Sequence, residues 1–580
     1  MRRWYRPFPG DTVRDVDGRS REFVCTETGA QQLDQLRSEL AESFTVSLGA
    51  RPARATRTWL DTFDWRLYKA GLTLQQVNAH SDSQLILNGP DAEQLTTPIN
   101  RTTRLRWPAM AAALPAGPLR DRLAPVIGNR ALLPVVRAAS QTSDLRLLNE
   151  DAKTVARVSV DSLSVTAPAD RGQGPLPARL TVHEVRGYAT AARRARRLLA
   201  GTDGVSSSRL TALDTALAAT GRHPLDYTGK VDVKLRPAMP GREAVALLLL
   251  QQLDTLEANV DGVLHDVDTE YLHDLRIAVR RTRSALKVVG DVLPGDLTLR
   301  FASEFRWLGD ITTPLRDLDV QLEELPSMAA GLVAARPADL EPFRLYLTRR
   351  RAAARRALNR GLRSDRFATV LGDWRKALTV PRAGRRPSGP RTGELAADRT
   401  RRAYNKVIKL GAAITDESPA ESLHTLRKRC KELRYVLEFF ASLHDPVAQR
   451  AMVGDLKRLQ DCLGEFQDCE VQQLEIQALA ASMLARQAAP APTLLAMGEI
   501  AGQLGRRQQQ ARTEFAGRFA GFAGSAGRRR LTALTASPRP ASPEPASLRA
   551  ASPEPASPEP ASPRPAAPRA ARSRTTAARP

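Results

Sequence analysis

The chain has 580 residues, which is too long for a single hydrophobic core and predicts two or three domains. Its 87 Lys and Arg outnumber its 63 Asp and Glu, and a net charge of +24 favours polyanionic partners such as nucleic acid, polyphosphate or an anionic membrane surface. Four scattered cysteines exclude a disulfide framework and are expected to be reduced thiols in the core. No apolar run is long enough to span a membrane, and the charged N-terminus lacks the apolar segment of a secretory signal, so we expect a cytoplasmic protein.

Residues 1–225 alternate short apolar runs with turn signals, a pattern typical of an α+β domain with antiparallel strands. Five segments are rich in β-branched residues and are predicted to be strands: 56–64, 72–77, 83–89, 154–166 and 178–188. Three segments carry apolar residues at helical spacing and are predicted to be helices: 30–44, 131–139 and 207–221. A loop rich in proline, glycine and charge follows, and residues 226–240 are predicted to be a linker.

From residue 241 the strand pattern gives way to long segments with helical spacing. We expect an all-α region over residues 241–527, made of two repeats at about 241–380 and 394–527. Residues 528–580 contain repeated ASPEP and ASPRP units, whose prolines prevent helix and sheet. This last segment is predicted to be a disordered tail rich in Pro, Ser, Ala and Arg.

The all-α region contains an internal repeat. "LHDLRIAVRRTRSALKVV" at 272–289 aligns with "LHTLRKRCKELRYVLEFF" at 423–440, at an offset of 151 residues. The same offset aligns "FRWLGDITTPLRDLDVQ" at 305–321 with "LKRLQDCLGEFQDCEVQ" at 456–472. Two segments that share one register predict a unit of about four helices that is used twice.

The first aligned segment carries a basic stripe in both copies. Side chains three or four residues apart lie on one helix face, and five in the first copy do so: His273, Arg276, Arg280, Arg283 and Lys287. The second copy has four on the matching face: His424, Arg427, Lys431 and Arg434. Like charges at this spacing destabilise a helix, so we expect a bound anion to compensate them. A solvated surface is the alternative for any single stripe, and either histidine could cap a helix or pack in the core.

Two further basic stripes are predicted on later helices. They extend the candidate anion-binding set by six residues: Arg349, Arg356, Arg360, Arg402, Lys406 and Lys409. Arginine suits such a site because its planar guanidinium forms two parallel hydrogen bonds to phosphate oxygens.

The duplicated histidine-bearing helix, together with "LRDLDVQ" and "LGEFQDCEVQ", resembles the CHAD family, the conserved-histidine α-helical domains. The resemblance covers about 280 residues. It implies two pseudo-symmetric four-helix bundles, a basic groove between them and binding of inorganic polyphosphate. The first copy departs from the family pattern, because it has "ITTPLRD" where the second has "LGEFQD", and its proline is expected to shorten that helix.

The segment "WLDTFDWRLYKAGLTL" at 59–74 resembles the CYTH (triphosphate tunnel) family, which implies an antiparallel β-barrel. Catalytic members need paired carboxylates to hold a divalent metal and basic residues to bind the triphosphate. Here Glu22 and Glu27 lie on opposite faces of the first candidate strand, and Glu184 stands alone where a pair is usual. We therefore expect a degenerate domain with no catalytic residue, no metal site and no cofactor.

The function that these patterns favour is non-catalytic binding of inorganic polyphosphate, serving storage, regulation or association with polyphosphate granules. One alternative is a metal-dependent tri- or polyphosphatase in the N-terminal domain. Another is a nucleic-acid-binding or scaffold protein, although the basic helices carry almost no aromatic residues for base stacking apart from Tyr435. Protein partners stay open.

Overall fold

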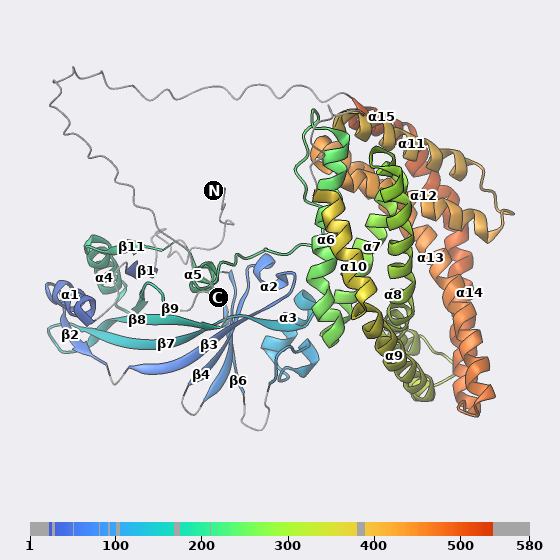
Figure 1. Ribbon diagram of the computed structural model, residues 1–580. Coiled ribbons are helices and arrows are strands. Elements are labelled where there is room, and N and C mark those ends of the chain that lie inside the picture. Colours follow the sequence, from blue (N-terminus) through green and yellow to red (C-terminus); the bar gives the residue numbers. More distant parts are fainter. Residues whose placement is uncertain are drawn as a thin grey trace, which may run out of the picture. The chain divides into compact units, whose positions relative to one another are not determined.

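The structure is a computed structural model in which a region of β-sheet is followed by a helical region (Figure 1). It describes residues 22–25, 30–49, 52–79, 82–90, 93–99, 105–167, 174–208, 210–379 and 389–536. Glu27 and residues 537–580, most of the predicted tail, lie outside the described residues. None of the helices in these ranges combines the length and the apolar character needed to cross a bilayer.

The N-terminal region is one antiparallel sheet in the spatial order β11-β1-β10-β8-β7-β3-β4-β5-β6, with β2 paired to β7 and β9 to β8. Its strands are β1 Glu22–Cys25, β2 Thr45–Leu48, β3 Ala53–Thr62, β4 Thr73–Ala79, β5 Ser83–Asn88, β6 Gln94–Ile99, β7 Leu132–Leu148, β8 Thr154–Ala167, β9 Gly174–Pro175, β10 Arg179–Glu184 and β11 Val205–Ser207. The antiparallel α+β class is confirmed. The expected barrel is not closed among the described strands, because β6 and β11 stay at opposite ends of the sheet.

In the part of this region that the structure describes, five α-helices accompany the sheet: α1 Ala30–Ala41, α2 Arg66–Lys69, α3 Pro118–Ile127, α4 Ala189–Gly201 and α5 Ala212–Ala219. The helices predicted at 30–44 and 207–221 correspond to α1 and α5. The helix predicted at 131–139 is wrong, since these residues begin β7. A short apolar run fits a buried strand as well as a helix, and here long ladders to β3 and β8 hold it extended.

Among its described residues, the helical region has five α-helices in each half. They are α6 Gly241–His265, α7 Thr269–Val289, α8 Gly295–Ala330, α9 Glu341–Leu362 and α10 Asp365–Thr379, then α11 Thr392–Ala412, α12 Ala420–Phe439, α13 Pro446–Ala485, α14 Ala491–Ala523 and α15 Ser525–Thr535. The first three helices of the second half each begin 151 residues after their counterparts, at 392, 420 and 446 against 241, 269 and 295. The repeat register read from the sequence therefore holds in three dimensions.

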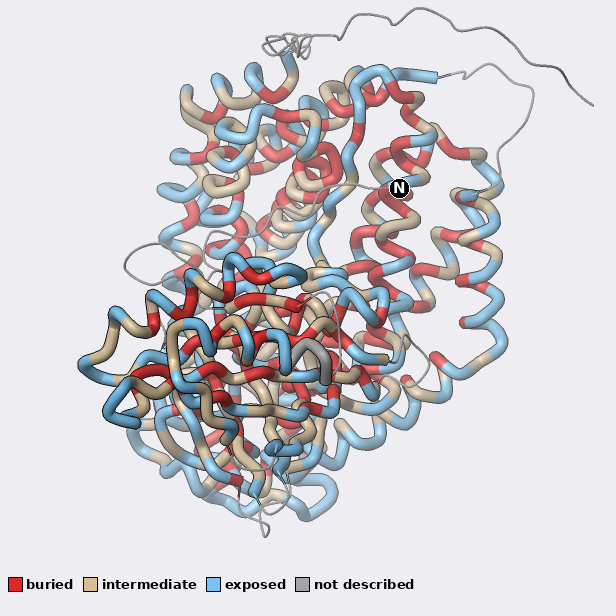
Figure 2. Tube along the Cα trace, turned by 90° about the vertical axis from the view of Figure 1, so that its left-hand side faces the viewer, coloured by how far each residue is buried: buried red, intermediate tan, exposed pale blue. Residues whose placement is uncertain are grey.

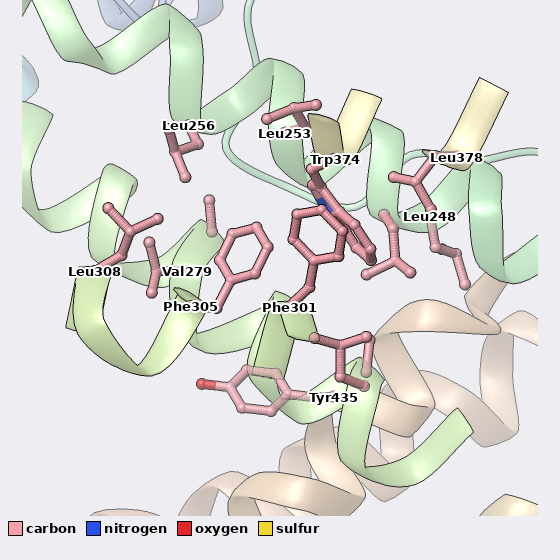
Figure 3. Packing of buried hydrophobic residues seen from close by; sticks show 14 of the residues in the cluster. Leu248, Leu253, Leu256, Val279, Phe301, Phe305, Leu308, Trp374, Leu378 and Tyr435 are labelled. Atoms are coloured by element: carbon pink, nitrogen blue, oxygen red, sulfur yellow. The ribbon is translucent and has the colours of Figure 1, made fainter. Parts of the chain in front are cut away.

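The fifth, shorter helix of each half was not predicted. In the first half, Trp374 of α10 is fully buried, and its ring lies 4.4 Å from that of Phe301 and 5.6 Å from that of Phe305, both on α8 (Figure 3). In the second half, Leu534 of α15 is buried in the core. This packing extends the helical region to residue 535, beyond Gly527, where the sequence pattern placed its end.

Pro314 does not shorten α8, contrary to the expectation from the sequence. The helix continues through Pro314 and Pro326 to Ala330. Immediately before Pro314, the hydroxyl of Thr313 donates to the Gly309 carbonyl at 2.8 Å, and Arg276 of α7 donates to the hydroxyls of Thr312 and Thr313 at 3.0 and 2.8 Å. These side-chain hydrogen bonds tie α8 to its neighbour at the point where proline removes a backbone donor.

The apolar stripes of α7 and α12 face the core, as the spacing predicts. Both stripes are buried: Leu275, Val279, Thr282, Leu286 and Val289 on α7, and Leu426, Cys430, Leu433 and Leu437 on α12 with Phe440 directly after it. Figure 2 shows buried residues in red along the inner sides of the helices and exposed ones in pale blue outside. The four cysteines are free and buried, and burial raises the pKa of the Cys430 thiol to about 12.

The segment that joins the two regions is part of the helical core. Leu235 and Met239, within the predicted linker, are buried against α6 and its neighbours. The two regions also share a charged contact, because the fully buried guanidinium of Arg130 pairs with Asp268 at 3.3 Å and with Asp274, both near the start of α7. The described residues between 22 and 536 accordingly belong to one compact unit.

Candidate anion-binding site

A cleft of about 620 Å³ opens between α7, α8 and α12. Seven of its lining side chains are cationic, and one is acidic. The cations are Arg280, Arg283 and Lys287 from α7, Arg306 from α8, and Arg427, Lys428 and Lys431 from α12; the acid is Glu432. His424, Ser284 and Tyr435 complete the polar part of the wall. The cleft thus gathers charge from both repeats.

Helices α7 and α12 run antiparallel beside the cleft, and ion pairs fix their register. Lys287 pairs with Glu432. Arg281, six residues before Lys287, pairs at 3.0 Å with Glu438, which is six residues after Glu432. Glu432 is also bound by Arg429 of its own helix at 2.7 Å. The one acid of the cleft is therefore already neutralised and does not offset the remaining cations.

Five cations of the cleft form no hydrogen bond or ion pair with a carboxylate in the described part of the chain: Arg280, Arg283, Arg306, Lys428 and Lys431. Gly309 of α8 leaves space for the Arg283 guanidinium, because a Cβ built at this glycine would lie 2.7 Å from Arg283 Nη1. Arg280 and Arg434 both approach the ring of Tyr435, at 6.0 and 5.6 Å. Cation–π contacts of this kind orient guanidinium groups without neutralising them.

The Tyr435 ring is a further unusual feature of the wall. The residue is 2% exposed, and its hydroxyl has no hydrogen-bond partner among the described residues. A buried hydroxyl without a partner costs free energy, and a ligand oxygen could accept a hydrogen bond from it. Figure 3 shows the Tyr435 ring at the edge of the apolar core that contains Phe301 and Phe305.

Lys431 is the amine most affected by the crowding of charge. Burial, and then the like charges of Arg427 and Arg280, lower the pKa of Lys431 to about 8. A bound anion would have the opposite effect, because it favours the charged ammonium. The charge of this residue is therefore coupled to occupancy of the cleft.

The two histidines occupy equivalent positions in the repeats but have different partners. His424 lines the cleft, and its Nδ1 bonds to the amide oxygen of Gln467, which leaves Nε2 for another partner. His273 is next to Arg316, which stands at the position equivalent to Gln467. Burial, followed by the charge of Arg316, lowers the pKa of His273 and so favours the neutral imidazole. His273 does not line the cleft.

The remaining residues of the two central stripes are bound to neighbouring helices. Arg276 is held by the Thr312 and Thr313 hydroxyls of α8, and does not line the cleft. Arg434 is 3.3 Å from the Gln460 oxygen and 3.2 Å from Glu438. Arg427 lines the cleft but also pairs with Asp468 at 2.9 Å. Six predicted residues therefore meet in the cleft: Arg280, Arg283, Lys287, His424, Arg427 and Lys431.

The predicted stripes on α9 and α11 do not line this cleft. Six exposed residues make up these stripes: Arg349, Arg356 and Arg360 on α9, and Arg402, Lys406 and Lys409 on α11. Arg402 pairs with Asp398 on its own helix at 2.8 Å. Arg306 and Lys428 also line the cleft but were not predicted from the sequence. Arg306 could have been found from the repeat, because it aligns with another cation, Lys457, at the 151-residue offset.

Two carboxylates of the sheet are bound by neighbouring side chains, whereas Glu184 of β10 is exposed. Asp161 receives Arg57 at 2.8 Å and the hydroxyls of Ser140 and Thr142 at 3.0 and 2.9 Å. Glu22 is 2.6 Å from Arg179. Across the described residues, no group of three or more His, Cys, Asp or Glu side chains is arranged to hold a metal ion.

Asp61, from the segment that resembles the CYTH family, has a structural environment. It is 2% exposed and accepts backbone N–H groups of Thr62, Leu67 and Tyr68 at 2.7, 2.9 and 2.9 Å. Burial raises the pKa of Asp61 to about 6. Its carboxylate organises the turn between β3 and α2. If an Asp61→Ala variant lost a phosphatase activity, that loss would not by itself show that Asp61 is catalytic.

The geometry defines the helical region as a duplicated all-α domain with a cationic cleft on its pseudo-symmetry axis. The family model of the CHAD domain matches residues 247–477, and this part of the chain is a CHAD domain. The chain is 29% identical over 307 residues to an uncharacterized protein of Mycobacterium tuberculosis, a match that covers 49% of this chain and 57% of that relative.

Two solved structures are similar to different parts of the chain. The CHAD domain from the plant Ricinus communis is 24% identical, with a TM-score of 0.39, and the match covers 53% of this chain and 96% of the plant domain. The Hippeastrum protein HpAC1, described as having a dominant triphosphatase activity, is 11% identical with a TM-score of 0.24; the match covers 36% of this chain and 98% of that one.

Proposed function

We propose that this protein binds inorganic polyphosphate in the cleft between α7, α8 and α12, without catalysis. One observation carries the proposal: five cations surround the cleft with no carboxylate partner among the described residues, while the one lining acid is already paired. Each unpaired like charge costs free energy in the free protein. A flexible polyanion with a charge at every repeat unit is the class of ligand that offsets all of them together.

Polyphosphate suits this wall better than nucleic acid does. The cations are arranged in three dimensions around a cleft, and the one aromatic residue of the lining, Tyr435, is 2% exposed. Binding of single-stranded nucleic acid normally uses exposed aromatic rings on which bases stack. Arg280 and Arg283 provide forked donors for phosphate oxygens, and the free hydroxyl of Tyr435 provides one more. Storage, regulation and association with granules are roles open to such a binder.

The test is a titration of the full chain with long-chain polyphosphate and with DNA of matched total charge, each across a salt series. Polyphosphate is expected to bind at least about tenfold more tightly than DNA, and its affinity to fall steeply with salt as counterions are released. The double variant Arg280→Glu/Lys431→Glu is expected to lose about 100-fold in affinity for polyphosphate. Equal affinity for the two polymers would instead support the nucleic-acid alternative.

A matched control separates the cleft from net charge. Arg450 on α13 and Arg506 on α14 are exposed and have no ion pair with the other described residues. Arg450→Glu/Arg506→Glu changes the net charge by the same amount as the cleft variant, and is expected to change affinity by less than about threefold. If both double variants lose affinity equally, the ligand binds by overall charge and the cleft is not the site.

A further inference from the structure

Lys431 differs from the other amines of the cleft. Lys287 is paired with Glu432, and Lys428 is exposed to solvent, whereas Lys431 is partly buried and has no carboxylate within ion-pair distance among the described residues. It lies on the cleft wall, one turn after Arg427 and next to the paired Glu432. Its amine is therefore directed to a cationic space and is not held by an acid.

The charged groups around Lys431 come from four helices. They are Arg280, Arg283 and Lys287 on α7, Arg306 on α8, Arg427, Lys428, Glu432 and Arg434 on α12, and Asp468 on α13. Burial and the nearby arginines lower the pKa of Lys431 to about 8, and Asp468 opposes them only in part. A substantial fraction of the amine is thus neutral near pH 8, and a neutral lysine amine is a nucleophile.

We propose that Lys431 is a site of covalent acylation by small acyl phosphates, the mixed anhydrides of a carboxylic acid and phosphoric acid. The inference rests on the proposed function, since the same arginines that would bind polyphosphate would hold the phosphate of the acyl donor. Among the nearby charges, those of Arg427 and Arg280 lower the pKa of Lys431 most, and these two residues suit this role. The uncharged acyl group would then be delivered to the one amine of the cleft that has no acid partner and is shielded from bulk solvent.

The proposed step balances without another reactant. The lone pair of Lys431 Nζ attacks the carbonyl carbon, and a C–N bond forms through a tetrahedral intermediate. The bond between the carbonyl carbon and the bridging oxygen then breaks. Its electron pair stays on that oxygen, and inorganic phosphate is released. The nitrogen loses a proton to the departing phosphate or to water. Guanidinium groups favour this step because they stabilise the charge that develops on the leaving phosphate.

Acylation would change the cleft permanently. The product is a neutral amide, so the cleft loses one cation, and the polyanion loses one partner. Bound polyphosphate would in turn protect Lys431, both by occupying the cleft and by favouring the protonated amine. Occupancy by polyphosphate and acylation of Lys431 are therefore expected to exclude one another.

The experiment incubates the full chain with acetyl phosphate at pH 8 and follows each lysine by peptide mass spectrometry. Lys431 is expected to be acetylated at least about tenfold faster than Lys428, and polyphosphate is expected to suppress that rate. Lys376, exposed on α10 outside the cleft, reports the reactivity of an ordinary surface lysine. If Lys431 reacts no faster than Lys428 and Lys376, the inference is wrong.

Two further measurements separate this inference from the proposed function. The affinity for long-chain polyphosphate is measured on the same preparation, and an unreactive Lys431 in a protein that binds polyphosphate overturns only the acylation. Lys431→Arg removes the nucleophilic amine, and total acetylation of the chain at pH 8 is expected to fall by the rate assigned to Lys431. Fast acetylation of Lys431 without any polyphosphate binding would overturn the proposed function, and with it the shared site.

Discussion

Lys287 of α7 and Glu438 of α12 occupy equivalent positions in the two repeats and carry opposite charges. Their partners, Glu432 and Arg281, are equivalent to one another in the same way. The two ion pairs are therefore symmetry mates across the axis between the halves, with both cations on α7 and both carboxylates on α12. Ser284 and Tyr435, which are also equivalent, lie midway between the two ion pairs along their helices and line the cleft beside this axis.

The Arg281–Glu438 pair predicts a charge-swap result. Arg281 is nearly buried, with 10% of its side chain exposed, so Arg281→Glu sets two poorly solvated acids together. We expect it to lower the free energy of unfolding by about 2–3 kcal/mol, measured by urea denaturation. The double variant Arg281→Glu/Glu438→Arg should recover part of this loss; recovery is partial because Arg281 also donates to the Gly229 carbonyl at 2.6 Å. Strictly additive losses would contradict the pairing.

Lys431 predicts how polyphosphate affinity depends on pH. Its pKa is about 8 in the free protein, and a bound anion raises it, so binding above that pH requires uptake of a proton. Affinity should stay level below pH 8 and fall by up to about tenfold between pH 8 and 9. The arginines around it stay charged over this range. Lys431→Arg is expected to remove the slope, and an unchanged slope in that variant would assign the titration to another group.

Arg276 is predicted to stabilise the fold more than it binds the ligand. It is part of the basic stripe in the sequence, but its guanidinium is bound to Thr312 and Thr313 of α8. Arg276→Ala should lower the free energy of unfolding by about 1–2 kcal/mol and change polyphosphate affinity by less than about threefold. Arg280→Ala should show the reverse, with a loss of about tenfold in affinity and little change in stability. Equal effects on affinity would place Arg276 in the binding site.

Gly262 predicts the effect of a single added methyl group. It lies where α6 crosses α7, and a Cβ at this position would be 2.1 Å from the Tyr271 ring, whose residue is buried. Gly262→Ala should therefore destabilise the protein by about 1–3 kcal/mol, even though alanine is the better helix former. Thermal unfolding measures the loss. Gly454→Ala on α13, with open space around its Cβ position, is the control and should not destabilise.

The sequence predicted the long helices and their repeat well, because a period of 3.6 residues over twenty or more positions leaves few alternatives. The starts of α11, α12 and α13 follow those of α6, α7 and α8 at the offset seen in the histidine-bearing segments. The run 131–139 was less informative, since its apolar residues suit either element until β3 and β8 pair with it. The open edges of the sheet depend on pairing between distant strands, which local patterns do not specify.

The candidate site was predictable only as a surface. The spacing places Arg276, Arg280 and Arg283 on one face of α7. Which of them stays free depends on α8, where hydroxyl groups bind Arg276 and Gly309 leaves room for Arg283. Stripes on α9 and α11 have the same spacing but lie outside the cleft. A stripe specifies charge along a helix, whereas a site requires knowing what the neighbouring helices present.

The exchange of charge between the repeats also has a consequence for ancestry. Two copies of α7 that met in the same antiparallel way would place Lys287 against Arg281, and two copies of α12 would place Glu438 against Glu432. Each half is thus a poor partner for itself and a good partner for the other. The sequences of the two halves differ so that each half pairs with the other and not with a copy of itself, and a single chain carries both.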